Sequence, residues 1–200
     1  MSLSHALGRT PARDAGAPTR ARQLANFVVF EAAWFACILG VAHGRPVCGT
    51  AAVVAAIAWH VAICARPATE LALVAILGAI GLVAESLVAT QGHVAYPAGQ
   101  PVAWLAPYWM VALWGELGIA LNVTLRWLKR SPLLALALGA VCGPLSFLGG
   151  VRLGGARFVD EAAALATLAC VWALLTPLVM ALSCRFDGVA DPVPGTGSDA

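Results

Sequence analysis

The sequence predicts an all-α membrane protein, a polytopic bundle of six transmembrane helices with both termini in the cytoplasm. Of its 200 residues 60% are hydrophobic and only 11% are charged. The mean hydropathy of +0.84 leaves too little polar surface to cover a water-soluble domain of this size. The apolar residues form six runs, separated by short segments that contain Pro, Gly or Arg. Basic residues gather in alternate connections, as expected for a chain that crosses a bilayer repeatedly.

Residues 1–23 are rich in Ala, Gly, Pro and Arg without apolar periodicity, which predicts a disordered cytoplasmic tail. The first helix is expected at 24–42. Its basic start and its small residues at 40–42 also resemble a signal peptide. However, about nineteen residues is long for a signal-peptide core, and Glu31, Trp34 and Phe35 lie inside it, which favours a membrane span.

The second helix is expected at 47–65, because Pro67 cannot continue a helix and restrains Arg66 before it. A third helix follows at 69–90. Residues 91–103 form the longest uncharged loop. The fourth helix then opens with three aromatic residues typical of a membrane interface and ends near 125; these are Trp104, Tyr108 and Trp109.

The fifth helix is expected at 132–150 with a bend at Pro144, and the sixth at 161–184, the most uniformly aliphatic of the set. Residues 185–200 are predicted to be a second disordered cytoplasmic tail, because from 187 on they are rich in Pro, Gly and Asp. The transmembrane domain is therefore expected to cover 24–184.

The distribution of Lys and Arg orients the six predicted spans. Three basic residues lie on the side opposite the termini: Arg45, Arg152 and Arg157. Nine lie on the side of the termini: Arg9, Arg13, Arg20, Arg22, Arg66, Arg126, Lys129, Arg130 and Arg185. Nine against three places both termini in the cytoplasm.

The same residues exclude several classes of site. The net charge is only +2, and the twelve Lys and Arg lie at segment ends rather than in one patch, so no nucleic-acid-binding surface is expected. The six Cys contain no C-x-x-C pair and the four His are scattered, so no metal site and no cofactor are predicted. The expected partners are the lipid bilayer and a membrane protein that contacts the helix at 161–184.

Small residues mark the predicted helix contacts. On the fifth helix they recur at spacings of four, three and four, which places them on one narrow face where another backbone can approach closely: Gly139, Gly143, Ser146 and Gly150. The third and fourth helices carry shorter stripes, at Gly78 and Gly81 and at Gly115 and Gly118. We expect these three helices to form a close-packed trio.

Polar residues within a span are costly and are candidates for function. Six are candidates here for binding a ligand or a proton: Glu31, His60, Glu85, Glu116, Asn122 and Ser146. Counting from the helix ends puts Glu31, His60 and Asn122 near the cytoplasmic side and Glu85 and Ser146 near the outer side. Glu116 falls near mid-span.

Two interpretations of these groups stay open. They can be interhelical hydrogen-bonding groups worth about 0.6 kcal/mol each. Alternatively, Glu85 or Glu116 binds a proton or a substrate group. Ser146 lacks a nearby His and the sequence context of a nucleophile.

Several residues together resemble a bacterial family of small membrane proteins, domain of unknown function 2878. They are Asn26-Phe27 with Trp34-Phe35; Asn122 with Leu125, Arg126 and Trp127; and Gly143-Pro144-Leu145-Ser146 with Leu153-Gly154. The resemblance covers nearly the whole chain between the tails and implies no particular activity. The family pattern has Gln near position 31 and Asp near 85, so Glu at both is a departure that puts a role for a neutral amide at 31 in doubt.

These observations favour a non-enzymatic protein of the bacterial inner membrane that handles a small or lipid-like ligand or assists a membrane partner. A membrane-embedded enzyme acting on lipid is the second hypothesis, against which stands the lack of a nucleophile–base pair or cofactor motif in the sequence. A purely structural subunit is the third.

Overall fold

A computed structural model describes residues 18–189 and confirms the all-α class. Residues 1–17 and 190–200, most of the two predicted tails, lie outside the described residues. The main helices are α1 (Arg20–Ala42), α2 (Pro46–Ala62), α3 (Pro67–Thr90), α4 (Tyr108–Leu121), α5 (Pro132–Arg152) and α6 (Glu161–Arg185). A short 3₁₀ helix, η1 (Arg126–Arg130), precedes α5, and two short strands, β1 (Val94–Ala95) and β2 (Arg157–Phe158), lie in the loops.

The helix starts follow local chemistry. Proline stands in the first turn of α2, α3 and α5, where its missing N–H is not needed. The other two long helices begin after side-chain caps: Thr19 accepts from the N–H of Arg22, and Asp160 accepts from that of Ala163. The cap at Thr19 explains why α1 begins at Arg20, four residues before the predicted start.

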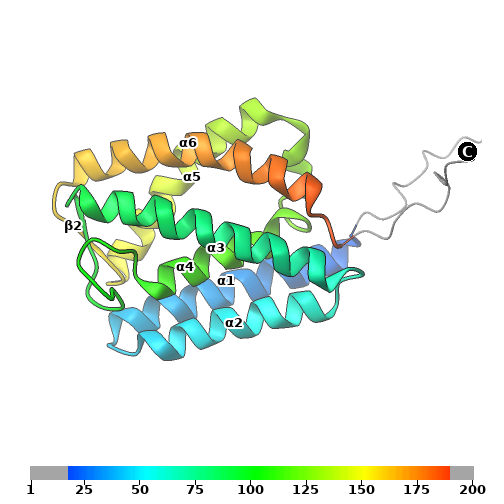
Figure 1. Ribbon diagram of the computed structural model, residues 1–200, viewed down its shortest axis with the longest axis horizontal. Coiled ribbons are helices and arrows are strands. Elements are labelled where there is room, and N and C mark those ends of the chain that lie inside the picture. Colours follow the sequence, from blue (N-terminus) through cyan, green and yellow to red (C-terminus); the bar gives the residue numbers. More distant parts are fainter. Residues whose placement is uncertain (1–17, 190–200) are drawn as a thin grey trace, which may run out of the picture.

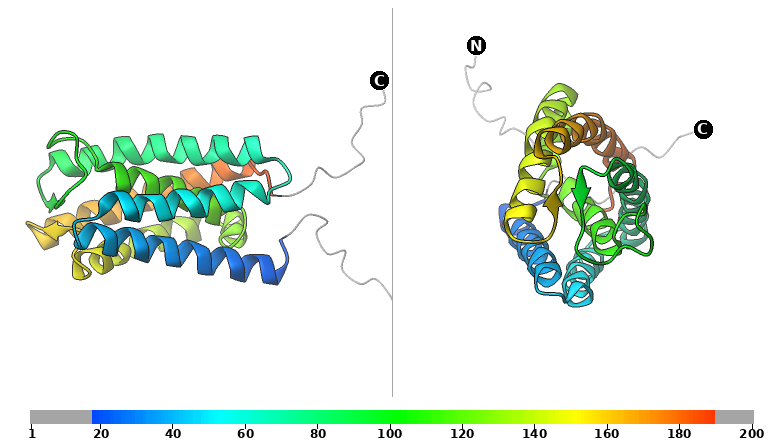
Figure 2. Two further views of the ribbon diagram at one scale, coloured as in Figure 1. Left: turned by 90° about the horizontal axis from the view of Figure 1, so that it is seen from below. Right: turned by 90° about the vertical axis from the view of Figure 1, so that its left-hand side faces the viewer.

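The helices lie side by side along one axis (Figure 1). Seen end-on, α4 lies inside a ring formed by the other helices (Figure 2). Its closest neighbour is α3, and it also contacts α1, α2 and α6, while the outer helices pair as α1 with α2 and α5 with α6. Nine of the residues of α4 are buried, including Trp109, Trp114 and Glu116.

Within residues 18–189, four helices are long and apolar enough to cross a membrane: α1, α3, α5 and α6. The other two, α2 and α4, are apolar but shorter, at 17 and 14 residues. A 14-residue helix is about 21 Å long, less than the roughly 30 Å of a bilayer core. The central position of α4 explains this length, because its neighbours and not lipid cover it. A count of six spans stays a prediction.

The start of α1 and the end of α6 lie at one end of the bundle (Figure 2). We call this the terminal end, formed by residues 18–22, 63–67, 122–132 and 185–189. The opposite, strand end carries β1 and β2, which pair antiparallel with Val94 opposite Phe158. The sequence analysis predicted loops there, because two-residue strands leave no alternating pattern to detect.

The glycine-rich helix faces lie at helix contacts, but one predicted contact is wrong. A Cβ on Gly81 of α3 would overlap with Trp114 of α4, and Gly118 of α4 lies against Val74 of α3, so this expected pair forms. The predicted close-packed trio of α3, α4 and α5 does not form. Gly139 and Gly143 of α5 face Thr176 and Trp172 of α6, and α5 packs on α6 rather than on α3 and α4. A stripe of small residues accepts any close neighbour and does not specify which one.

Two further segments differ from the sequence prediction. Helix α4 ends at Leu121 and begins at Tyr108, so Trp104 and Leu125 lie outside it. At the C-terminus, residues 187–189 belong to the predicted disordered tail but fold against α3 and η1. The N–H of Gly188 donates to Glu70 at 2.7 Å, and Val189 is buried.

Candidate functional site

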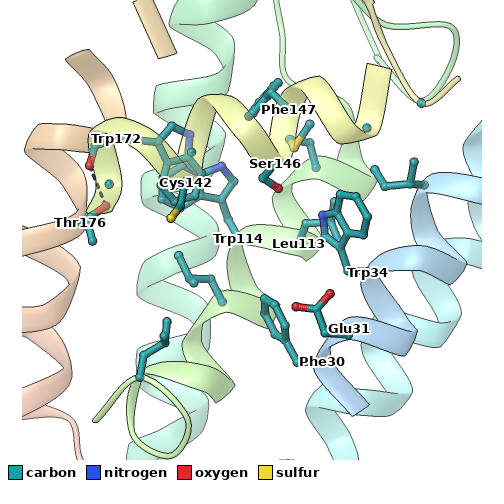
Figure 3. A pocket seen from close by; sticks show the side chains of 18 of the residues that line it. Phe30, Glu31, Trp34, Leu113, Trp114, Cys142, Ser146, Phe147, Trp172 and Thr176 are labelled. Atoms are coloured by element: carbon teal, nitrogen blue, oxygen red, sulfur yellow. Dashed lines mark hydrogen bonds between the residues drawn. The ribbon is translucent and has the colours of Figure 1, made fainter. Parts of the chain in front are cut away.

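A cavity of about 350 Å³ lies between α1, α4, α5 and α6. Its walls are mainly aromatic and aliphatic, and Figure 3 shows Phe30, Trp34, Trp114 and Trp172 around it. Trp114 and Trp172 stack at 4.7 Å between ring centroids. The volume falls in the range of small-molecule sites, which bind apolar surface and orient it with a few polar groups.

The fifth-helix stripe forms one wall of the cavity. Gly139, Gly143, Ser146 and Gly150 all line it. Because glycines carry no side chain, the stripe leaves room beside α5 that larger residues would fill. Ser146 both lines the cavity and is exposed, so the cavity is open at this position. In a membrane this opening would face lipid.

Two polar groups in the cavity wall have no partner. The carboxyl group of Glu31 points into the cavity between Phe30 and Trp34 (Figure 3) and makes no hydrogen bond or ion pair within residues 18–189. The indole N–H of Trp172 is buried and also lacks an acceptor among the described residues. An acceptor and a donor are thus available to a molecule in the cavity.

Glu85 lies elsewhere, near the strand end, and its carboxylate has two donors. The Nε1–H of Trp114 donates to Oε1 at 2.9 Å, and the hydroxyl of Tyr96 donates to Oε2 at 3.1 Å. Glu85 is 1% exposed and does not line the cavity. It joins α3 to α4 and to the loop after β1, which suits the hydrogen-bonding interpretation better than the ligand interpretation.

Glu116 is the opposite case. It is 0% exposed, and neither carboxyl oxygen has a hydrogen-bond partner among the described residues. It does not line the cavity either. A buried carboxyl group without a partner is costly in its charged form.

A second polar cluster occupies the terminal end, centred on Glu70, which is 0% exposed. His60 Nε2 is hydrogen-bonded to Glu70 Oε2 at 2.9 Å, and the side-chain amide of Asn122 donates to Oε1 at 2.7 Å. The N–H of Gly188 donates to the same oxygen. An ionised carboxylate can only accept hydrogen bonds, and here Glu70 accepts from three groups.

Charged residues close this cluster toward the end of the bundle. Asp187 pairs with Arg126 at 2.6 Å and with Lys129 at 3.2 Å. Lys129 also donates to the side-chain oxygen of Asn122. Burial lowers the pKa of Lys129, and the nearby Asp187 counters part of that effect. The cluster therefore links α2, α3 and α4 to η1 and to the segment after α6.

Cys64 lies beside His60, with its Sγ 3.4 Å from Nε2. The thiol donates to the backbone oxygen of His60 at 3.1 Å. A catalytic triad would need Cys and Glu on different ring nitrogens of the His, whereas here both face Nε2. The geometry does not give a nucleophile–base pair.

A family model described as "Protein of unknown function (DUF2878)" matches residues 23–178. The chain belongs to this family. Membership in DUF2878 confirms the resemblance drawn from the motifs at 26–35, 122–127 and 143–154, and it brings no activity with it. No curated protein and no solved structure gives a significant match.

The structure sorts the sequence candidates of this DUF2878 protein into separate places. Glu31 and Ser146 line the cavity, and His60 and Asn122 meet at Glu70, whereas Glu85 lies apart from both. Glu116 does not line the cavity, but it is close enough to Glu31 for the two carboxyl groups to interact electrostatically. Sequence analysis missed Glu70, because it stands in the first turn of α3 and resembles an ordinary interfacial charge. It also missed Cys64, although a spacing of four from His60 is a detectable signal.

Proposed function

We propose that this protein binds one lipid-like molecule in the cavity between α1, α4, α5 and α6. The observation that carries the proposal is the combination of an apolar cavity of about 350 Å³ with two unpartnered polar groups in its wall, Glu31 and the indole N–H of Trp172. The apolar part of the molecule would contact the Trp and Phe side chains. Its polar head would bond to Glu31.

The opening of the cavity on α5 supports the entry of a lipid directly from the bilayer. Ser146 and Cys142 of α5 line the cavity and are exposed. A lipid can therefore enter sideways without first leaving the membrane. The neighbouring Leu145 does not line the cavity and is 58% exposed, as expected for a side chain that contacts lipid.

The distribution of charge also supports a cellular location. We place the protein in the inner (plasma) membrane of a bacterium as a multi-pass protein with both termini in the cytoplasm. The nine-to-three distribution of basic residues and the common end of α1 and α6 support this orientation.

Native mass spectrometry of lipid that copurifies with the protein in mild detergent tests the proposal. Ser146→Trp should fill the cavity and abolish copurified lipid, while Leu145→Trp, a neighbour outside the cavity, should keep it. Glu31→Gln keeps the shape and should weaken retention of lipids whose heads carry a cationic group. Equal lipid retention by the two Trp variants would refute the proposal and favour the structural-subunit hypothesis.

A further inference from the structure

Three metal-ligating side chains meet at the turn between α2 and α3. His60, Cys64 and Glu70 each offer one ligand atom, and these atoms all lie within 4.8 Å of one another. All three residues are buried, at 1%, 9% and 0% exposure. None of them lines the lipid cavity, so this cluster is independent of the proposed function.

The local fold explains why they meet. His60 is in the last turn of α2, and Cys64 follows four residues later in the turn. Pro67 starts α3 and places Glu70 in its first turn, which folds back beside His60. The spacing is close to what a small ion needs: four-coordinate zinc sites, with bonds of about 2.0–2.3 Å, keep ligand atoms roughly 3.3–3.7 Å apart. The Cys64–His60 distance is already 3.4 Å.

Neighbouring groups hold the carboxylate in a fixed orientation. Asn122 and the N–H of Gly188 both bind Oε1 of Glu70 at 2.7 Å, which leaves Oε2 toward His60. Such outer contacts orient ligands in metal sites. A guanidinium N–H of Arg22 donates to Cys64 Sγ at 3.4 Å.

We infer that His60, Cys64 and Glu70 form a zinc site at the α2–α3 turn, and the hydrogen bonds of Glu70 to Asn122 and Gly188 connect this site to α4 and to the C-terminal segment. Zn²⁺ replaces the hydrogen bond between His60 and Glu70. The ring proton of neutral His60 moves from Nε2 to Nδ1 by exchange with solvent, and the ion binds Nε2, Glu70 Oε2 and Cys64 Sγ. The thiol proton of Cys64 is released to solvent as the Zn–S bond forms. Thiolate and carboxylate together cancel the charge of the ion, so the buried site is neutral.

Metal binding to the purified full-length chain tests this inference. After chelator treatment and incubation with Zn²⁺, wild type should retain one equivalent through desalting, as measured by elemental analysis. With Co²⁺ as a probe, it should show thiolate-to-metal charge-transfer absorption. Cys64→Ala should lose the absorption and the retained zinc, whereas Cys170→Ala, at an exposed cysteine of α6, should keep both.

Asn122→Ala provides a second measurement, because it removes an orienting contact but no ligand. It should weaken zinc affinity about 10- to 100-fold. All variants are compared as monodisperse, helical protein. Zinc absent from wild type, or equal zinc retention by Cys64→Ala and wild type, overturns the site while leaving the lipid proposal untouched.

Discussion

Asn122 and Glu70, 52 residues apart in the chain, are hydrogen-bonded at 2.7 Å in the interior of the terminal end. The same amide of Asn122 donates to the backbone oxygen of Phe186 at 2.9 Å. This one side chain therefore ties the end of α4 to the start of α3 and the end of α6. The polar cluster at the terminal end acts as a common joint for helices that are distant in sequence.

Glu70→Ala should therefore destabilise the protein strongly. It leaves the buried donors of Asn122, His60 and Gly188 without their acceptor, at a cost of about 3 kcal/mol or more. For a chain of this size the midpoint of thermal unfolding should fall by about 6–12 °C in detergent. Glu161→Ala, at an exposed first-turn position of α6, is the control and should cost less than about 1 kcal/mol. Chelator in both samples keeps metal binding out of the comparison.

Gly143→Ala tests the contact between α5 and α6. A Cβ at Gly143 would overlap with the side chain of Trp172, so the change should cost about 1–3 kcal/mol and lower the folded yield. Gly78→Ala is the matched control, because the nearest atom to its Cβ would be 3.8 Å away. Gly143→Leu should be still more damaging, and Leu136→Ala, on an exposed position of α5, should be mild. Equal melting temperatures for Gly143→Ala and Gly78→Ala would contradict the close packing.

Glu85 and Glu116 should respond differently to the same substitution. Glu85→Leu removes the acceptor of Trp114 and Tyr96 and should destabilise by about 1–3 kcal/mol, whereas Glu116→Leu removes a group without a partner and should be neutral or stabilising. Glu85→Gln should keep stability, because an amide can bond to both neighbours. Melting temperature and complementation in cells are measured together. Loss of complementation by stable Glu85→Gln would support proton or ligand binding there instead.

The phenol of Tyr96 should ionise only at strongly alkaline pH. Burial raises its pKa well above 10, and the charge of Glu85 and their hydrogen bond add to the shift. Because the folded pKa is raised, the contribution of Tyr96 to stability is fully present below pH 10 and is lost as the pH rises beyond that value. Phenolate absorbance, compared with Tyr96→Phe, measures the titration. A difference signal already complete near pH 10 would contradict the buried contact.

Membrane topology can be tested with Cys48 and a C-terminal reporter. Cys48 is exposed at the start of α2, at the strand end, so it should react with an impermeant thiol reagent added outside the cell. Cys64, buried at the terminal end, is the control and should not react in a chain where it is the only cysteine. A reporter at the C-terminus that works only in the periplasm should be silent. Reporter activity would mean that the number of spans is not six or that the first helix is cleaved.

Local chemistry made much of the fold predictable. Long apolar runs predict helices because backbone groups in lipid must bond within the chain, and Pro67 and Pro132 mark helix starts that need no partner from elsewhere. The glycine faces of α3 and α4 predicted their contact correctly. The resemblance carried by the motifs around Asn26, Asn122 and Gly143 is confirmed by the family match.

The tertiary structure alone decided which groups share a site. The stripe at Gly139 and Gly143 fits any closely packed neighbour, so only the three-dimensional arrangement assigns it to Trp172 of α6. Glu70 meets Gly188 across 118 residues, and no local pattern encodes that distance. The cavity at Glu31 exists because α1 and α5 leave space beside α4. Helices form from short-range hydrogen bonds and hydropathy, which a sequence displays, whereas cavities and polar clusters depend on long-range packing, which it does not.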